Sequence, residues 1–525
     1  MSEWNKNQWG AQQPGGYEPP YIANGGPSPG YSQPYAQSMQ PPEATGKPYE
    51  NGDPKSPYES GRFKPEKRVN DIFFLIFFIS QLLGFAALSG IVISQWISTG
   101  GLGGGVGNET GTSVTLDRHT VYLLLFVTAV ALVLSSLYLM LARALTKFFM
   151  HVTLILSILF NVGISIYYWI TGYHSGAIIH TIIAVFSVFS YLGFRNRIPL
   201  ATLLLQVVID VSKHHISVYF VAFGALLVQA ALSIWFAFTV IATYAKWTPG
   251  NPTCGAGSSC SSSKVTGLIV FEVFSYLWTS QVIRNVTLAT LAGGPYGCWY
   301  YFGPREQGLM PKHPALLAFG RASTLSLGSI AFGSLIVTLL EILRIILNAV
   351  RNNADASGRP VQVCLACCAE CFAGCIEGIV KCFNRYAYIE IALYGKSYVS
   401  AAKDTWNMIK DRGIDLLIND SLVGITLTWG AFSVGLLCSL FGYLYVHLSN
   451  ASYNSQGQYT PPIVLFSFLI GLQSSMTLSS ALEAGVSTIF VGLGEDPQVL
   501  AVRAPALFAM IAKTYPRAVQ GIPRV

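Results

Sequence analysis

Nine stretches of about twenty or more mostly apolar residues recur along this 525-residue chain, and they constrain its fold more than any other feature. A bilayer core about 30 Å thick is crossed by roughly 20 apolar residues in a helix. Only 11% of the residues are charged, whereas soluble domains carry about 25%. We therefore expect an all-α polytopic membrane protein, not a soluble enzyme or a nucleic-acid-binding protein. The segments lie near 72–97, 120–142, 148–171, 175–194, 216–245, 265–292, 316–347, 420–448 and 463–493.

A tenth segment, 361–383, is short, rich in cysteine and interrupted by Glu370 and Glu377. It can span the membrane, lie at its surface or cap the helix bundle. The Asn-Ala-Ser sequence at Asn450 helps to choose among these alternatives, because an odd number of spans would leave it in the cytoplasm. The sequence therefore favours about ten transmembrane helices within a transporter-like domain, residues 69–493.

Basic residues near the ends of the spans predict the orientation, because lysine and arginine are enriched in the cytoplasmic loops of membrane proteins. Lys64, Lys67 and Arg68 precede the first span and place the N-terminus in the cytoplasm. Ten spans then return the C-terminal tail, residues 494–525, to the same side. The inner loops account in this way for the net charge of +7.

The loops left outside carry features of an oxidising, glycosylating compartment. Asn108 and Asn450 each begin an Asn-X-Ser/Thr sequence, so both are predicted glycosylation sites. Cys254 and Cys260 share a Gly/Ser-rich outer loop and are predicted to form a small disulfide. Both features agree with the orientation that the basic residues predict.

Residues 1–68 are rich in Pro, Gly, Gln and Tyr and contain no apolar run able to form a core. Such a composition buries too little apolar surface to offset the entropy of ordering, so a disordered cytoplasmic tail is predicted. It has no signal-peptide pattern, and the first span is expected to target the chain to the membrane. The tail is either simply solvated or a ligand for a cytoplasmic partner, since Pro-rich segments bind aromatic-lined domains.

Four ionisable residues lie inside apolar segments, where their cost marks a pathway or a binding site by default. Glu272 is followed closely by Tyr276 and Trp278. A carboxylate beside aromatic rings suits a quaternary ammonium group, which is bound by ring faces and a counter-charge because it has no proton to donate. The alternative is that these rings are ordinary packing residues. The four residues are Glu272, Arg284, Glu341 and Glu483.

Two further patterns leave alternatives open. Gly293, Gly294 and Pro295 follow the sixth span and predict either a discontinuous helix of the transporter type or an ordinary helix exit. Six cysteines between residues 364 and 382 have mostly helical spacing, which favours apolar packing or acylation over a metal site. Nucleotide-binding and hydrolase motifs are absent, so neither a cofactor nor a metal is expected.

Several stretches together resemble the choline transporter-like family over roughly residues 70–500, and GEDPQVL at 494–500 is similar to its fungal branch. The resemblance implies ten helices, cytoplasmic termini and a choline-type organic cation as substrate. The stretches are NDIFF at 70–74, LWTS at 277–280, WYYF at 299–302, ALLAFGR at 315–321, KCFNRYAYIEIALYG at 381–395 and SAAKD at 400–404.

The leading hypothesis is secondary transport of a small organic cation across the plasma membrane, with substrate bound between helices near mid-membrane. Trp278 and Tyr276 are the expected ring faces, Glu272 is the counter-charge, and Glu341 and Glu483 are candidate proton or cation relays. Membrane lipids surround the helices. The alternative is a membrane scaffold or sensor that recruits partners through its tail. A lipid-modifying enzyme is disfavoured because no nucleophile–base constellation occurs in the inner loops.

Overall fold

The computed structural model describes residues 65, 67–98, 118–172, 174–248, 261–304, 310–412, 415–449 and 460–515. In these ranges every regular element is a helix, and ten candidate spans are long and apolar enough to cross a membrane. The predicted all-α polytopic membrane fold, with its count of ten, is confirmed. Most of the predicted tail, the two sequons at Asn108 and Asn450, and the Cys254–Cys260 pair lie outside the described residues.

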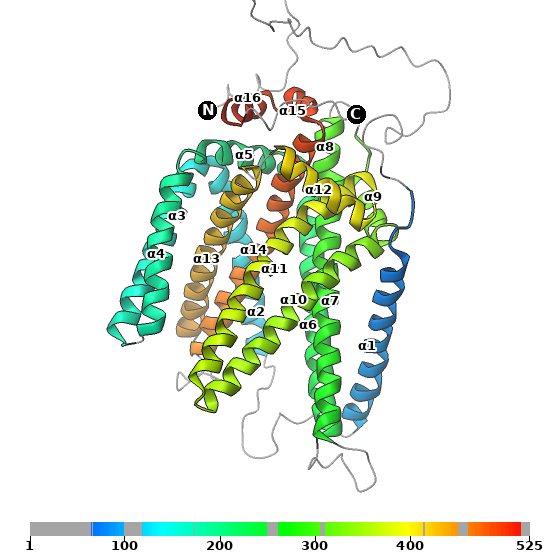
Figure 1. The fold of residues 1–525 in the computed structure, drawn as a ribbon, viewed down its shortest axis with the longest axis vertical. Coiled ribbons are helices and arrows are strands. Elements are labelled where there is room, and N and C mark those ends of the chain that lie inside the picture. The colour runs from blue at the N-terminus through cyan, green and yellow to red at the C-terminus, as the bar shows by residue number, and fades with distance from the viewer. Residues whose placement is uncertain are drawn as a thin grey trace, which may run out of the picture. The chain divides into compact units, whose positions relative to one another are not determined.

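Long helices stand side by side, and a set of short helices lies across one end of the bundle (Figure 1). That end also holds Asp71, at the start of the first helix, and is named the Asp71 end below. The long helices are α1 (Ile72–Ser98), α2 (Arg118–Ala144), α3 (Thr146–Ile170), α4 (His174–Phe194), α6 (Ser217–Trp247), α7 (Ser262–Leu291), α10 (Leu327–Ala356), α11 (Pro360–Tyr394), α13 (Asp415–Ser449) and α14 (Thr460–Glu495). The short ones are α5 (Ile198–His214), η1 (Ala292–Tyr296), α8 (Gly297–Phe302), α9 (Pro314–Ser323), α12 (Tyr398–Arg412), α15 (Pro497–Arg503) and α16 (Pro505–Thr514).

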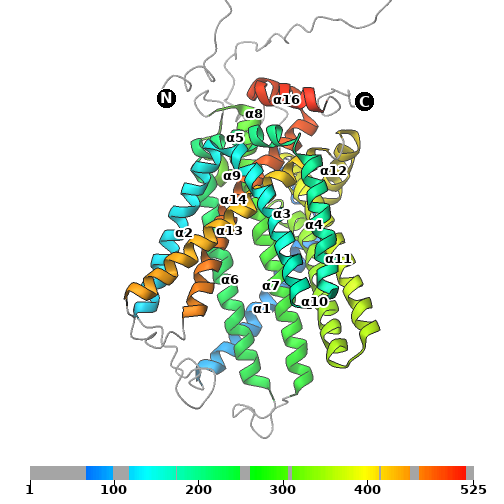
Figure 2. The same ribbon diagram turned by 90° about the vertical axis from the view of Figure 1, so that its left-hand side faces the viewer.

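Helices α13 and α14 run side by side next to α2, as Figure 2 shows. Small residues allow their close contact. A side-chain carbon added to Gly471 would lie 2.6 Å from the Cys438 sulfur and 3.1 Å from the Cα of Gly435. Membrane helices associate largely through such backbone approach, because lipid gives no hydrophobic drive between them. Many large apolar side chains remain exposed on the outer helices, as Phe186 and Phe220 do, which suits contact with lipid tails.

The predicted span 316–347 is two helices in the structure, α9 and α10. The hydroxyls of Ser323 and Thr324 donate to the carbonyls of Phe319 and Gly320, at 2.7 and 2.6 Å, which satisfies the end of α9. The spanning helix begins only at Leu327. Apolar composition runs across the break, so hydropathy alone joins the two helices, and the local side-chain bonds that end α9 separate them.

The short segment 361–383 is part of one 35-residue helix, α11, which provides a candidate span over Val361–Tyr394. It forms an antiparallel pair with α10. The acidic residues that interrupt its apolar pattern face basic partners, as described below, so they do not break the helix. Of the three alternatives for this segment, the helix length and composition favour a span.

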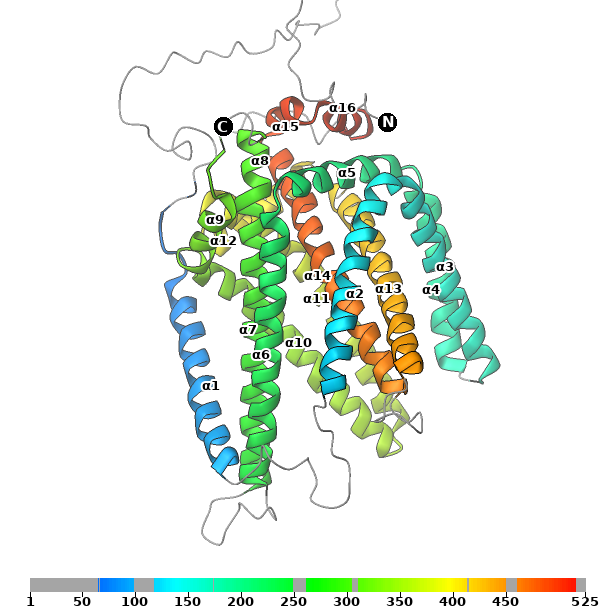
Figure 3. The ribbon, with the colours of Figure 1, turned by 180° about the vertical axis from the view of Figure 1, so that it is seen from behind.

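The region after Glu495 contains two helices where the sequence predicted a tail. Leu507 and Ile511, four residues apart on α16, are buried, and α16 contacts α5. Figure 3 shows α5 lying across the Asp71 end, with α15 and α16 above it. An apolar stripe of one helical turn is sufficient to hold this segment on the bundle.

Candidate functional site

Glu272 lies on α7 with its carboxylate fully buried. It accepts a hydrogen bond from the Thr243 hydroxyl of α6, and its second oxygen has no hydrogen-bond partner. No basic side chain of the described residues forms an ion pair with it. An unpaired buried carboxylate in a membrane span costs several kcal/mol unless it binds a proton or a cation.

The two predicted ring residues face different neighbours. Tyr276 stacks on Phe236 of α6 at a centroid distance of 4.4 Å and bonds Ser233, so it lies on the same side of α7 as Glu272. Trp278 is fully buried, and its indole N–H donates to the Ala331 carbonyl of α10 at 3.0 Å. Rings from α1 and α7 pack around the indole in this conformation. The structure thus brings Glu272 and Tyr276 together and separates both from Trp278.

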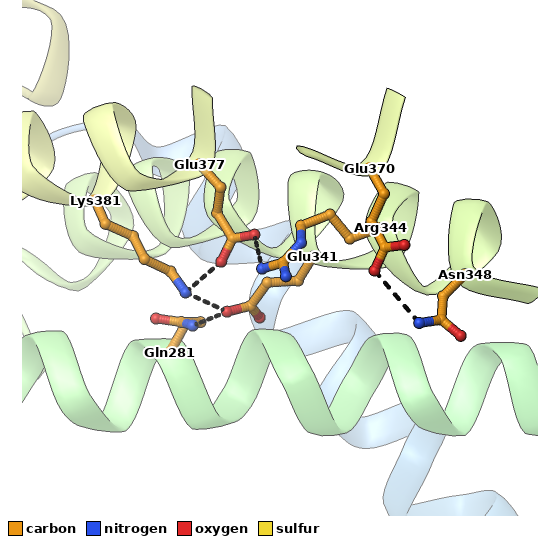
Figure 4. A network of polar contacts seen from close by, with 7 residues as sticks. All are labelled: Gln281, Glu341, Arg344, Asn348, Glu370, Glu377 and Lys381. Carbon is orange, nitrogen blue, oxygen red and sulfur yellow. Dashed lines mark hydrogen bonds and ion pairs between the residues drawn. The ribbon is translucent and has the colours of Figure 1, made fainter. Parts of the chain in front are cut away.

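Glu341 belongs to a row of ion pairs between α10 and α11, drawn in Figure 4. It accepts from Lys381 at 2.7 Å and from Gln281 of α7 at 2.8 Å. Lys381 also pairs with Glu377, which in turn binds Arg344 at 2.9 Å. These groups are the inner part of what we name the α10–α11 ladder.

The ladder continues toward the end of the bundle opposite Asp71. Arg351 pairs with Glu370 at 2.7 Å, and Asn348 donates to the same carboxylate. The positions 341, 344, 348 and 351 recur at three and four residues, so they form one polar stripe along α10. Their partners on α11 descend in step, from 381 through 377 to 370.

Glu483 of α14 lies in a second group, the central cluster, formed by Arg284, Arg385, Asp420 and Glu483. The Arg385 guanidinium reaches Glu483 at 3.3 Å and Asp420 of α13 at 3.5 Å. Asp420 also accepts from the hydroxyls of Tyr386 at 2.8 Å and Ser487 at 2.9 Å. Four long helices, α7, α11, α13 and α14, therefore contribute ionisable side chains to one region of the interior.

Sequence reasoning did not identify Lys381, Arg385 or Asp420 as site residues. Lys381 and Arg385 lie within the stretch 381–395, which indicates a family resemblance but no specific role, and Asp420 lies at the start of the predicted span 420–448. A usable signal was present, because the acidic residues 370 and 377 and the basic residues 381 and 385 repeat at four- and seven-residue spacing. That spacing is typical of a charged helix face.

At the Asp71 end, hydrogen bonds join the segment before α1 to α10 and to the region of α12, and we name this contact the clamp. Asp71 adopts a left-handed backbone conformation with φ of 54°. Its carboxylate accepts from the Ser329 hydroxyl of α10 at 2.6 Å and from the Tyr398 backbone N–H of α12 at 2.8 Å. The Asn70 amide donates to the Gly395 carbonyl at 2.7 Å. A non-glycine residue with positive φ is strained and persists only where its surroundings fix it.

Charged and phenolic groups beside the clamp also form ion pairs and hydrogen bonds. Lys396 pairs with Glu390 at 3.0 Å and with Asp404 at 2.8 Å. Burial lowers the pKa of the Lys396 amine, but these two carboxylates raise it more, so the net pKa is above its ordinary value and the amine stays charged. Burial also raises the pKa of Tyr398 to about 12, and its hydroxyl donates to Asn384 at 2.6 Å. Near neutral pH, Lys396 is therefore charged and paired with both carboxylates, and Tyr398 is neutral.

Gly328 is expected to be indispensable to the clamp. A Cβ there would lie 2.6 Å from the backbone oxygens of both Asn70 and Asp71, and backbone cannot turn away as a side chain can. We expect Gly328→Ala to destabilise the folded protein by about 1–3 kcal/mol, as overpacking does. Thermal unfolding of the purified protein, followed by tryptophan fluorescence, measures the change.

The matched control is Gly224→Ala on α6, where the added carbon meets nothing within 4 Å. Alanine is favoured over glycine in a helix interior by about 1 kcal/mol, so this variant should be neutral or stabilised. Equal unfolding temperatures for the two variants would contradict a close contact at Gly328.

The cysteines of α11 are mostly exposed along the helix, with Cys382 half-buried. In the described part of the chain, no three metal-ligating side chains come together. The Gly-Pro segment after α7 is buried, and the chain continues through η1 into α8 with a kink at Gly294. A Cβ at Gly293 would lie 2.7 Å from the Ala392 carbonyl oxygen, so the glycine permits close packing against α11.

Comparison with known proteins agrees with this architecture. A family model described as "Plasma-membrane choline transporter" matches residues 178–498. A protein from Cryptococcus neoformans named "Protein PNS1" is 57% identical over 98% of this chain and 95% of its own length. Proteins of the same name from Mycosarcoma maydis and Candida albicans are 41% and 38% identical, over 93% and 90% of this chain and 92% of their own lengths.

The fold defines an all-α, multi-pass membrane protein with ion pairs between its long helices. With these matches, the chain belongs to the choline transporter-like family. The resemblance seen in the sequence is confirmed.

Proposed function

We propose that this protein is a secondary transporter of a small organic cation of the choline class, acts at the plasma membrane and is not an enzyme. The observation that carries the proposal is a row of charged side chains on membrane-spanning helices. These side chains are only partly covered by other protein atoms. Arg344 and Lys381 of the ladder keep 44% and 36% of their side-chain surface open. Arg385 of the central cluster keeps 30%.

Charged groups at this depth must meet water, because exposing them to lipid costs at least about 2.5–3.5 kcal/mol each. The ladder therefore supports a water-accessible route leading from the end opposite Asp71 toward the central cluster. The clamp at Asp71 closes the other end. A route open at one end and closed at the other is what alternating access requires. A scaffold or sensor has no need of such a route.

Glu272 is the candidate site for the cationic group. Its carboxylate lacks a basic partner, and the Tyr276 ring lies one helical turn further along the same face. A quaternary ammonium group would neutralise the carboxylate and lie against aromatic surface. Trp278 is assigned a positioning role, since it holds α7 against α1 and α10. Glu341 and Glu483 are candidate relays along the route.

Uptake of radiolabelled choline into vesicles containing only the purified protein tests the proposal. We expect saturable uptake that depends on an imposed proton or cation gradient and that exceeds uptake into protein-free vesicles. Lys381→Gln should abolish most of the uptake, because it leaves the Glu341 carboxylate without a cationic partner beside Glu377, which keeps Arg344 alone. Uptake no greater than in protein-free vesicles under every gradient would refute transport of choline.

The scaffold alternative rests on the N-terminal tail and is separated by truncation. Removing residues 1–60 should leave uptake unchanged if the helix bundle is the functional unit. The predicted outer positions of Asn108 and Asn450 belong to the same proposal. Glycosidase treatment of the protein from its native membrane should increase its electrophoretic mobility, and the change should disappear when both asparagines are replaced by glutamine.

A further inference from the structure

Arg284 is a basic residue inside a membrane span that has no partner in the described part of the chain. It lies in the half of α7 that is nearer the Asp71 end. It makes neither a hydrogen bond nor an ion pair with any described residue. Its side chain keeps accessible surface although much of the protein surrounds it, and Arg385, Glu483 and Glu341 lie within electrostatic range. An accessible side chain among such neighbours borders a space between the helices.

The carboxylates closest to Arg284 are already engaged. Glu341 accepts from Lys381 and Gln281, and Glu483 is bound by Arg385. The guanidinium of Arg284 therefore has five N–H donors available toward that space. Arginines in spans are almost always paired, so a free one marks a place where something else supplies the negative charge.

A bare organic cation does not suit this position. It would meet the Arg284 charge, which no described side chain pairs with, while the carboxylates of the cluster, Asp420 and Glu483, are already bound by Arg385. A planar guanidinium instead matches carboxylate and phosphate oxygens in a bidentate manner and also binds halides as a charge. The chemistry that fits the open side of Arg284 is therefore anionic.

We propose that Arg284, supported by Arg385, binds a small anionic group within the central cluster. The proposal deepens the proposed transport function and rests on it for its biological meaning, but binding itself can be measured without transport. The anionic group has two sources. It is either a small inorganic anion that accompanies the cation, or the acidic group of a substrate that carries both charges.

The distance between Glu272 and Arg284 along α7 determines where each kind of ligand can bind. Residues 272 and 284 are 12 positions apart, or about 18 Å along a helix. A small zwitterion cannot reach both. An accompanying anion would thus occupy Arg284 while a cation occupies Glu272, and the two unpaired groups of α7 would be neutralised together. A zwitterion would bind entirely in the central cluster, with its ammonium group near Glu483.

The experiment measures binding to the purified full-length protein in detergent. Radiolabelled chloride and phosphate are the inorganic probes, and choline and glycine betaine, which differ by a carboxylate in place of an alcohol, are the organic pair. Variants Arg284→Gln and Arg284→Lys are compared with Arg143→Gln. Arg143 of α2 pairs with Asp210 of α5, both side chains are partly exposed, and neither forms an ion pair with a residue of the central cluster.

We expect saturable binding of at least one anionic probe, weakened at least tenfold by Arg284→Gln, partly retained by Arg284→Lys and unchanged by Arg143→Gln. Chloride or phosphate that binds alone and tightens choline binding identifies an accompanying anion. Betaine that binds more tightly than choline, and loses this advantage in Arg284→Gln, identifies a zwitterion.

The proposal is overturned if no anionic probe binds saturably, or if Arg284→Gln and Arg143→Gln bind all probes equally to the parent protein. Failure of choline uptake into vesicles, with anion binding intact and dependent on Arg284, would refute the proposed cation transport and leave the anion site standing. The two failures are therefore distinguishable.

Discussion

Replacing Asp420 with asparagine is expected to lower the free energy of unfolding by about 3–5 kcal/mol, the usual cost of removing one partner from a buried ion pair. Only 5% of the Asp420 side chain is exposed. It accepts from Tyr386 and Ser487 and faces Arg385, so its negative charge serves three neighbours from two other helices, α11 and α14. Asparagine keeps the shape but turns a donor toward groups that are themselves donors, and Arg385 is left with Glu483 alone.

Thermal unfolding in detergent, followed by tryptophan fluorescence, measures the loss. The matched control is Asp210→Asn, which breaks the pair with Arg143 on the surface, where both side chains are partly open. Exposed pairs contribute about 0–1 kcal/mol, so this variant should unfold close to the parent protein. Similar destabilisation by both substitutions would show that Asp420 is not a buried charge partner.

A second substitution keeps the test informative if Asp420→Asn cannot be purified. Arg385→Gln added to Asp420→Asn removes the uncompensated positive charge. Some of the lost stability should return, since the penalty comes mainly from the unpaired charge and not from the lost attraction. No recovery would mean that the hydrogen bonds from Tyr386 and Ser487 dominate instead.

The membrane fold was predictable from sequence because each span must satisfy its own backbone and present apolar side chains to lipid. That constraint acts on each segment separately, and hydropathy therefore finds it. The same reasoning failed at 316–347. Whether an apolar run is one helix or two depends there on the hydroxyls of Ser323 and Thr324, which hydropathy does not represent.

The site was harder to predict because ion pairs join helices that are far apart in sequence. Glu341 and Glu483 were recognisable as costly residues, but their partners depend on α11 lying between α10 and α14. Nothing in a single sequence specifies that neighbourhood. The orientation of α7 was equally hidden, since Tyr276 and Trp278 are two positions apart and helical geometry separates their directions by about 200°.

The role of Arg284 was also not predictable from the sequence alone. The sequence marks it as an expensive residue inside a span, but a structural ion pair would explain it as well as a binding site would. Only the placement of Glu341 and Glu483 against other bases leaves Arg284 without a partner among the described residues. The functional meaning of a charge in a membrane helix therefore depends on which neighbours are already engaged.

Glu272→Gln is expected to weaken choline binding by up to about 1,000-fold. Each 1.4 kcal/mol is tenfold in affinity, and two unit charges about 4 Å apart attract by about 4 kcal/mol at an effective dielectric constant of 20. Glutamine preserves the size of the side chain and can still accept from Thr243, so the substitution removes mainly the charge. Equilibrium binding of radiolabelled choline to the purified variant measures the effect.

The control ligand is the neutral carbon isostere of choline, in which a tert-butyl group replaces the trimethylammonium. It has the same shape and no charge, and its affinity should not depend on whether position 272 is glutamate or glutamine. The control variant is Thr243→Val, which removes the donor to Glu272 while keeping the carboxylate. It should weaken choline binding less than Glu272→Gln does, since one hydrogen bond to a charged group contributes about 1.5–3 kcal/mol, or roughly 10- to 150-fold in affinity. If Glu272→Gln weakens both ligands alike, the substitution acts through the packing of α6 against α7. If it weakens neither, the cation binds elsewhere. The carboxylates of the ladder and the central cluster are then the groups to replace next, because these acidic side chains of the spans lie beside partly exposed charged neighbours.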